Sequence, residues 1–142
     1  MTLTLSTTRN VEDVRALRHA VFVDEQGFSE EDEFDARDHD ALHLMLSDGE
    51  TLVGCARVFS ADGEGRIGRI CVARSHRGRG LGARLVEAGM SELRARGETR
   101  VALGAQVRAQ GFYEALGFLP RGEVYDDGGV PHQMMERALA SK

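Results

Sequence analysis

The sequence predicts a mixed α/β fold in which one central sheet is flanked by helices. Short apolar runs typical of strands alternate with segments whose apolar residues recur at helical spacing, and turn pairs of the Asp-Gly type separate them. With 142 residues, 42% of them hydrophobic, the chain can bury a core without disulfides or a metal ion. We therefore expect a single domain over residues 1–142.

The first half of the chain is predicted to form a strand, a helix and a hairpin. Asn10 is a candidate N-cap, and apolar residues spaced for one helical face follow it as far as about Glu25. A polar, acidic loop with room for a helical turn comes next. Asp48-Gly49 then indicates a hairpin. The expected bounds are a strand at 3–6, a helix at 10–25, a loop at 27–40, and strands at 42–46 and 51–59.

The second half is predicted to alternate strand and helix before a final hairpin. Asp62-Gly63 marks a turn, and Gly97 ends the longest helix. Asp127-Gly128-Gly129 marks the turn of the last hairpin. The expected bounds are a strand at 65–72, a helix at 79–96, a strand at 100–104, a helix at 109–116, and strands at 123–125 and 132–138.

A glycine-rich segment between a predicted strand and a predicted helix is the strongest indication of function. Arg77-Gly78-Arg79-Gly80-Leu81-Gly82 lets backbone N–H groups approach an anion at a helix N-terminus, and its arginines suit phosphate oxygens. A P-loop would need Lys-Ser or Lys-Thr after its second glycine, and the dinucleotide-binding pattern needs a different glycine spacing. A structural turn, which only lets a strand and a helix meet closely, is the alternative.

The spacing of Arg77, Gly80 and Gly82 resembles the acyl-CoA pyrophosphate loop of the GNAT-type N-acetyltransferase superfamily. Residues 111–118, Gly-Phe-Tyr-Glu-Ala-Leu-Gly-Phe, are similar to the second signature of that superfamily. Residues 21–26 and 129–135 resemble a bacterial subfamily of uncharacterised members, the latter through a Gly-x-Pro-His-x-x-Met element. The resemblance spans most of the chain, in family order.

This resemblance implies a mostly antiparallel sheet that splays at its middle, with acetyl-CoA in the gap as co-substrate. It also implies direct transfer of the acetyl group to a primary amine of a small molecule, peptide or protein. The pyrophosphate would be held by the backbone of the loop, which comprises Arg77, Gly78, Arg79, Gly80, Leu81 and Gly82.

The same resemblance assigns roles around the thioester. A backbone N–H among Ile70, Cys71 and Val72 would stabilise the oxyanion. Tyr113 aligns with the family's general acid, whose phenol stays protonated at neutral pH. Gln106 stands near the pantetheine arm, where the family commonly has Asn.

The general base and the acceptor site are less defined. Glu25, Glu31, Glu33 and His132 are candidates, and a water chain without a dedicated residue is an alternative. The acidic residues from 30 to 40 either attract a cationic amine or form a solvated loop. A lone histidine such as His132 is more often a structural hydrogen-bonding group than a base. The histidines have no cysteine or acidic partner at ligand spacing, so we expect no metal.

Charge is distributed unevenly along the chain. The net charge is −5, yet residues 24–40 hold nine acidic residues against one arginine, whereas residues 66–108 hold ten arginines against three glutamates. A basic middle suits a polyanionic cofactor such as CoA. The acidic overall balance and the 6% aromatic content argue against a nucleic-acid partner.

Location and competing functions complete the expectations. No apolar run reaches the length of a membrane span, and residues 1–9 lack a signal-peptide pattern, so we expect a cytoplasmic protein with no membrane partner. Cys55 and Cys71 are interpreted as reduced core residues, and Cys71 is not favoured as a nucleophile because its place in an apolar run favours burial. A non-catalytic acyl-CoA-binding or sensor domain is the competing class, followed by a nucleotide-binding regulator. A homodimer is left open, since no segment requires one.

Overall fold

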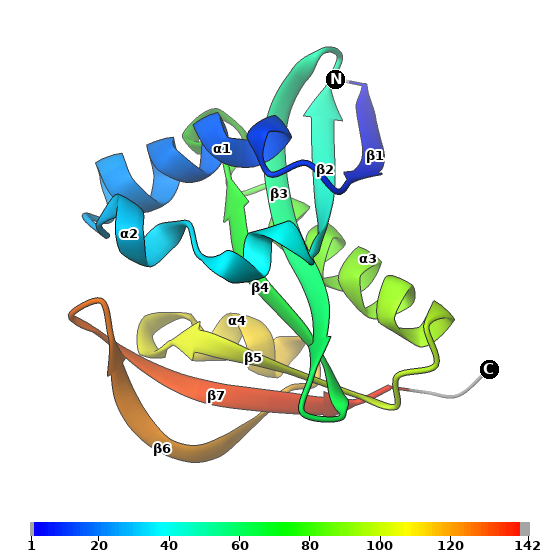
Figure 1. Ribbon diagram of the computed structural model, residues 1–142, viewed down its shortest axis with the longest axis vertical. Helices are drawn as coiled ribbons and strands as arrows, with labels where there is room; N and C mark the ends of the chain where they lie inside the picture. The colour runs from blue at the N-terminus through cyan, green and yellow to red at the C-terminus, as the bar shows by residue number, and fades with distance from the viewer. Residues whose placement is uncertain (1, 140–142) are drawn as a thin grey trace.

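A computed structural model describes residues 2–139 of the chain (Figure 1). The strands are β1 (Leu3–Thr8), β2 (Leu42–Asp48), β3 (Thr51–Ala61), β4 (Glu64–Val72), β5 (Arg100–Gln106), β6 (Leu119–Asp127) and β7 (Val130–Ala138). The α-helices are α1 (Glu12–Arg18), α2 (Glu30–Glu33), α3 (Leu81–Ala95) and α4 (Gln110–Ala115). A π-helical turn, η1 (His19–Glu25), continues α1, and the 3₁₀ turns are η2 (Ala36–His39), η3 (Arg74–His76) and η4 (Val107–Ala109). None of the described helices is long and apolar enough to cross a membrane.

The seven strands form one sheet in the order β1-β2-β3-β4-β5-β7-β6, in which β4 and β5 are the parallel neighbours. These two strands are paired only at Gly65 with Val101 and Arg66 with Ala102. Beyond that point they separate, and Figure 1 shows β4 rising away from β5. The mixed α/β fold with a mostly antiparallel sheet, splayed at its middle and flanked by helices, is confirmed.

Two apolar clusters cover opposite faces of the sheet. Along β2, Leu44 and Leu46 belong to the cluster under α3, whereas Met45 packs against the cluster under α1. Successive side chains of a strand point to opposite faces, so α1 and α3 lie on different sides. Helix α3 sits close to the sheet, because a Cβ added to Gly89 would lie 2.8 Å from Ile67 Cδ1. Helix α1 thus packs on one face of the sheet and α3 on the other.

Strand β4 contains a bulge just before its last residues. Cys55 of β3 pairs with Cys71, and Arg57 pairs with Gly68, so Ala56 lies opposite two residues of β4. Arg69, one of these two, has a left-handed backbone with φ of 50°. The extra residue changes which side chains face each side of the sheet.

The largest differences between the structure and the sequence expectation lie in three segments. The first helix starts at Glu12, whose N–H donates to Asn10 Oδ1 at 3.1 Å, and it widens into η1 after Arg18. The segment expected to be an acidic loop contains two helical turns, α2 and η2. Strand β6 is longer than the expected 123–125, because exposed side chains along nearly all of it hide the alternation that marks a strand.

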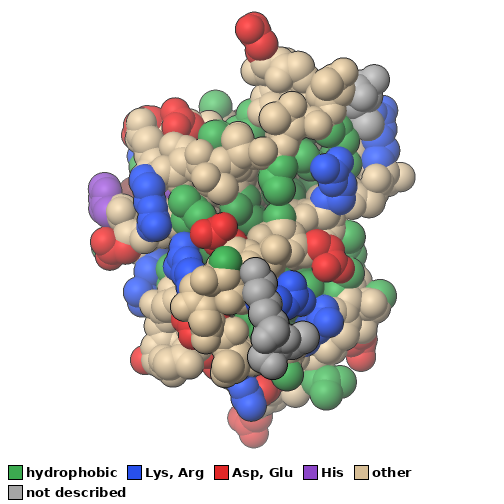
Figure 2. Space-filling view, turned by 90° about the vertical axis from the view of Figure 1, so that its right-hand side faces the viewer, with side chains coloured by type: hydrophobic (Ala, Val, Ile, Leu, Met, Phe, Trp, Pro, Cys, Tyr) green, Lys and Arg blue, Asp and Glu red, His purple; other side chains and the backbone are tan. Residues whose placement is uncertain are grey.

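The arginine-rich middle of the sequence does not produce a continuous basic face on the side shown in Figure 2. On that side, basic and acidic side chains are interspersed among hydrophobic ones. Ion pairs such as Arg66 with Glu64, at 2.8 Å, bring the two signs together. Residues that are clustered by charge in the sequence are therefore mixed in space.

Candidate active site

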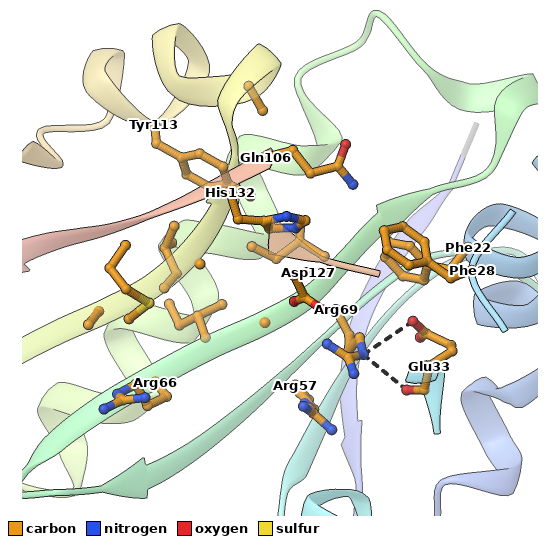
Figure 3. Close-up of a pocket in the computed structure, with 18 of the residues that line it drawn as sticks. Phe22, Phe28, Glu33, Arg57, Arg66, Arg69, Gln106, Tyr113, Asp127 and His132 are labelled. Carbon is orange, nitrogen blue, oxygen red and sulfur yellow. Dashed lines mark hydrogen bonds and ion pairs between the residues drawn. The ribbon is translucent and has the colours of Figure 1, made fainter. Parts of the chain in front are cut away.

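A cavity of about 400 Å³ opens where β4 and β5 separate. Gly68 and Ile70 line it from β4, and Gly104 and Gln106 line it from β5. Figure 3 shows Tyr113, Gln106 and His132 on one side of this space and Phe22, Phe28 and Glu33 on the other. The cavity therefore lies between the N-terminal helical segments and the C-terminal hairpin.

The glycine-rich loop connects η3 to the N-terminus of α3. Gly78 and Gly80 have φ values of 77° and 75°, a conformation that favours glycine, and a Cβ on either residue would meet nothing within 4 Å. Gly80 is the N-cap of α3 and supplies no side-chain hydrogen bond to its first amides. Unpaired amides and open space at the start of a 15-residue helix fit a pyrophosphate group.

The other residues of the loop have distinct environments. Leu81 is buried in the core under α3, so it anchors the loop rather than contacting a ligand with its side chain. Gly82 lies under the ring of Phe112, whose Cζ would be 3.4 Å from an added Cβ. Arg77 donates from Nη1 and Nη2 to the carboxylate of Glu25, both at 3.0 Å, and from Nε to the Val72 carbonyl at 2.9 Å. The loop, with Arg79 between its first two glycines, is thus held from both ends.

Glu25 is positioned as an ion-pair partner of this loop. The Arg77 guanidinium, aided by Arg74 at 3.2 Å, lowers the pKa of the Glu25 carboxyl. Glu25 lines two smaller hollows beside the main cavity. A carboxylate with a lowered pKa and two cationic partners is a poor proton acceptor.

The three residues expected to stabilise an oxyanion form the end of β4. On the side that faces β5, this strand has no pairing beyond Arg66, so its later backbone groups are outside a β4–β5 ladder. Ile70 lines the main cavity, and Cys71 and Val72 line an adjoining hollow. An unpaired strand edge beside a cavity can present N–H groups to a developing negative charge.

The thiol of Cys71 is directed into the core under α1. Its sulfur lies 3.5 Å from that of Cys55, and both cysteines are free and buried. The contact with Cys55, together with burial, raises the pKa of the Cys71 thiol well above its usual range. A thiol that stays protonated is a weak nucleophile, in agreement with its interpretation as a core residue.

Tyr113 lies on α4 with its ring among aromatic neighbours and lines the main cavity. Its ring centroid is 5.0 Å from that of Phe112 and 6.0 Å from that of Phe118, both in edge-to-face geometry. Burial raises the pKa of Tyr113 to about 12, so the phenol keeps its proton at neutral pH. Gln106, also in the lining, donates from Nε2 to Gln26 Oε1 at 2.8 Å.

His132 lies in β7, which pairs with β5 on one side and β6 on the other. It is opposite Gln106 in the first pairing and Tyr125 in the second. The residue is 7% exposed and lines the cavity, with its Nδ1 2.8 Å from the Val130 carbonyl oxygen. The hydrogen bond expected of a structural histidine is therefore present, and the ring also faces the candidate site.

The acidic segment is folded into a buried charge network. Arg18 donates from Nε to Glu33 Oε2 at 2.8 Å and from Nη1 to Asp38 Oδ1 at 2.7 Å. Arg57 donates from Nη1 to Asp35 Oδ1 at 2.7 Å and to Asp38 Oδ1 at 2.9 Å. The expectation of a solvated loop is therefore wrong for Glu33 and Asp38, which are buried, and right for Glu31, which is exposed.

In this network, burial raises the pKa of each carboxyl group and the neighbouring arginines lower it. Burial opposes the charged form of Asp38, but Arg18 and Arg57 outweigh it and lower the pKa of this carboxyl. For Glu33, burial outweighs Arg69 and Arg18, and the pKa is raised. The sequence could not reveal this network, because Arg18 and Arg57 come from a helix and a strand far from residues 30–40. Among residues 2–139, no group of three or more potential ligands could hold a metal ion.

Comparison with known proteins agrees with this arrangement. Residues 11–118 match the Acetyltransferase (GNAT) family. The chain is 36% identical over 128 residues to the uncharacterized N-acetyltransferase YjcF of Bacillus subtilis, covering 89% of this chain and 91% of YjcF. The crystal structure of Escherichia coli ElaA superposes with a TM-score of 0.85 at 30% identity, covering 96% of this chain and 99% of ElaA.

An acyl-CoA N-acyltransferase from Pseudomonas aeruginosa also superposes with a TM-score of 0.85. It is 30% identical, and the match covers 96% of this chain and 100% of that structure. The open glycine loop, the gap between β4 and β5 and the protonated Tyr113 all fit binding of an acyl-CoA. The chain therefore belongs to the GNAT acetyltransferase family and is an acyl-CoA-dependent N-acyltransferase.

Proposed function

We propose that the protein transfers the acetyl group of acetyl-CoA directly to a primary amine of a small molecule, peptide or protein. The observation that carries this proposal is Tyr113, a buried phenol that keeps its proton and lines the cavity at the splay of the sheet. Direct transfer needs a proton donor beside the departing sulfur and no covalent enzyme intermediate. The buried, protonated Cys71 supports the absence of an acyl-enzyme.

Different residues of the chain bind the pyrophosphate, stabilise the oxyanion and protonate the leaving sulfur. Acyl-CoA supplies the acyl group as a thioester, so the reaction forms an N–C bond and breaks a C–S bond. The backbone amides from Arg77 to Gly82 bind the pyrophosphate, and the unpaired edge of β4 at Ile70–Val72 donates to the carbonyl oxygen. Tyr113 donates its phenolic proton to the departing sulfur.

The acceptor arrives as a cationic ammonium group. Two carboxylates in the cavity lining, those of Asp32 and Asp127, have no side-chain hydrogen bond or ion pair within residues 2–139. Glu33 is bound by Arg18 and Arg69, and Glu31 is not among the lining residues. We therefore assign attraction of the amine to Asp32 and Asp127 rather than to the buried network.

The two cysteines indicate where the protein is located. Two free, buried thiols 3.5 Å apart are typical of a protein kept in a reducing compartment, which supports a cytoplasmic location.

Thermal melting with acetyl-CoA, CoA or ATP in excess tests the donor. A ligand bound only by the folded protein raises the melting temperature, so acetyl-CoA and CoA should raise it and ATP should not. Thiol release from acetyl-CoA in the presence of a panel of primary amines then tests turnover. Stabilisation by CoA with no thiol release from any amine would favour a non-catalytic acyl-CoA-binding domain. No stabilisation by either CoA species would contradict the proposal.

A further inference from the structure

We propose that His132 is the general base that takes a proton from the acceptor's ammonium group, and that the Val130 carbonyl fixes the tautomer that makes this transfer feasible. The inference rests on the proposed function for the identity of the acceptor. It rests on the geometry of the hairpin β6–β7 for the identity of the base.

The tautomer follows from one hydrogen bond. His132 Nδ1 lies 2.8 Å from the carbonyl oxygen of Val130, and a carbonyl oxygen can only accept. Nδ1 must therefore carry a hydrogen. In the neutral ring the other nitrogen, Nε2, then has the free lone pair, which is the form that a base requires.

Nε2 is also accessible from the cavity. The imidazole lines the cavity, and its Nε2 has no hydrogen-bond or ion-pair partner among residues 2–139. Within residues 2–139, Arg57 Nε is the one buried side-chain nitrogen or oxygen atom that has no hydrogen-bond partner. Nε2 is therefore not sealed in the core, and with the residue only 7% exposed, the space it meets is the cavity. Figure 3 shows the His132 ring projecting into that space between Tyr113 and Phe22.

The ring is held in place by its backbone and by one neighbour. Pro131 has a fixed φ and confines the residue before it, Val130, to extended conformations, so the accepting carbonyl has little freedom. The ring of Tyr125 packs on the imidazole with centroids 5.9 Å apart. Because β7 is paired on both sides, a hinge motion of His132 would break strand pairing. The base is thus preorganised before any ligand binds.

The other charged and titratable groups in the lining are less suited to this role. Tyr113 and Tyr125 have raised pKa values and stay protonated, and Glu33 is bound by arginines. The remaining groups are Asp32 in α2, Arg57 in β3, Arg66 and Arg69 in β4, Arg108 in η4 and Asp127 in β6. An arginine has no acceptor atom for a proton, and the two aspartates are assigned to attraction of the ammonium group.

The protons balance with His132 in this role. Nε2 takes one proton from the ammonium group, and the neutral amine forms the N–C bond. The nitrogen then loses a second proton, which restores the phenol of Tyr113 after that phenol has protonated the sulfur. The imidazolium returns its proton to water, so each turnover yields an amide, free CoA thiol and one proton.

Nuclear magnetic resonance of protein with ¹⁵N-labelled histidine tests the geometry without any acceptor. The chain has five histidines, and the signal lost in His132→Asn assigns the one of interest. We expect the Nδ1–H tautomer in the neutral ring, with the lone pair at Nε2. An Nε2–H tautomer would overturn the proposal even if the enzyme is active.

Kinetics of the same variant test the chemistry. The Asn amide can still donate to the Val130 carbonyl but cannot act as a base. We expect kcat/KM for an alkylamine to fall by about 100-fold and its acidic limb to disappear from the pH profile. An aromatic amine, already neutral at pH 7, should lose much less activity, and CoA affinity should stay unchanged.

His39→Asn is the matched control, because His39 is exposed on η2 and is not among the residues lining the cavity. It should behave as the parent protein with both amines. Equal losses for alkyl and aromatic amines in His132→Asn, or an unchanged pH profile, would identify a structural role only. Absence of activity in the parent protein would contradict the proposed function, while the resonance experiment would still decide the tautomer and the accessibility of Nε2.

Discussion

The acidic segment of residues 30–40 and the hairpin β6–β7 line the same cavity, but Glu33 and Asp38 of the segment are used differently from Asp127 and His132 of the hairpin. In the acidic segment, Glu33 and Asp38 are bound to Arg18 and Arg57 and are buried with them. On the hairpin, His132 and Asp127 keep an atom or a group without a protein partner among residues 2–139. A polar group whose hydrogen bonds are already made stabilises the fold, whereas one left open toward a cavity is available to a substrate.

The largest expected effect is on stability, from the removal of Arg18. Arg18→Met leaves Glu33 and Asp38 buried without their main cation, and we expect a loss of about 3–5 kcal/mol in the free energy of unfolding. Urea denaturation measures it. Arg15→Met is a close control, because Arg15 also lies over the Phe34 ring but forms an exposed pair with Glu12. It should change stability by no more than about 0.5 kcal/mol. Similar losses in both variants would mean that the network is not the source.

The next effect is on turnover, from the phenol of Tyr113. Tyr113→Phe keeps the ring contacts with Phe112 and Phe118 but removes the proton donor, so kcat should fall by about 100-fold with CoA affinity unchanged. Tyr125→Phe is the comparison within the same cavity, since its hydroxyl contacts Met134 Sδ at 3.6 Å. Its kcat should fall far less. Full activity of Tyr113→Phe in a steady-state thiol-release assay would exclude the acid role.

A smaller effect is expected on CoA binding, from the glycine loop. Gly80→Asp puts a carboxylate at the N-cap of α3, against the pyrophosphate, and should weaken CoA binding by about 10-fold or more. Gly97→Asp controls for backbone strain, because Gly97 also has a positive φ, 89°, but follows the other end of α3. Isothermal titration calorimetry should show normal CoA affinity in the control. Equal weakening in both variants would assign the effect to strain.

The smallest effect separates the exposed carboxylate of the acidic segment from the hairpin carboxylate. Asp127→Asn should raise the KM for a diamine acceptor several-fold, since Asp127 lines the cavity without a partner in the described part of the chain. Glu31→Gln should leave that KM unchanged, because Glu31 is exposed and is not among the cavity-lining residues. The reverse ranking would assign substrate attraction to Glu31 rather than to Asp127.

The order of the elements was predictable from local patterns, whereas the use of the acidic segment was not. Asp48-Gly49 and Gly97 act through backbone geometry that a few neighbouring residues determine, so their turn and helix end were read correctly. The partners of Glu33 and Asp38 come from elements distant in sequence, and only the assembled sheet brings them together. Residues 24–40 include nine acidic residues, and such a segment is expected to be solvated as long as its cationic partners are unknown.

The candidate site shows the same division. The glycine loop was identifiable because its glycines are required within one turn, and two of them do adopt positive φ. The pairing of Arg77 with Glu25 joins residues 52 positions apart, and no local pattern indicates it. For His132, the sequence favoured a structural histidine. Its Val130 hydrogen bond agrees, but the orientation of the second nitrogen depends on strands β5 and β6 on either side.

The bulge at Arg69 sets a limit on how this chain can change by insertion or deletion. Ile67, Ile70 and Val72 all pack toward the α3 cluster, while Cys71 packs toward the α1 cluster, an alternation that exists only because β4 has one extra residue. Deleting that residue would turn the side chains at the end of β4 to the opposite face of the sheet, including those that border the cavity. Homologous chains that keep this chemistry should therefore keep the number of residues between Ile67 and Val72.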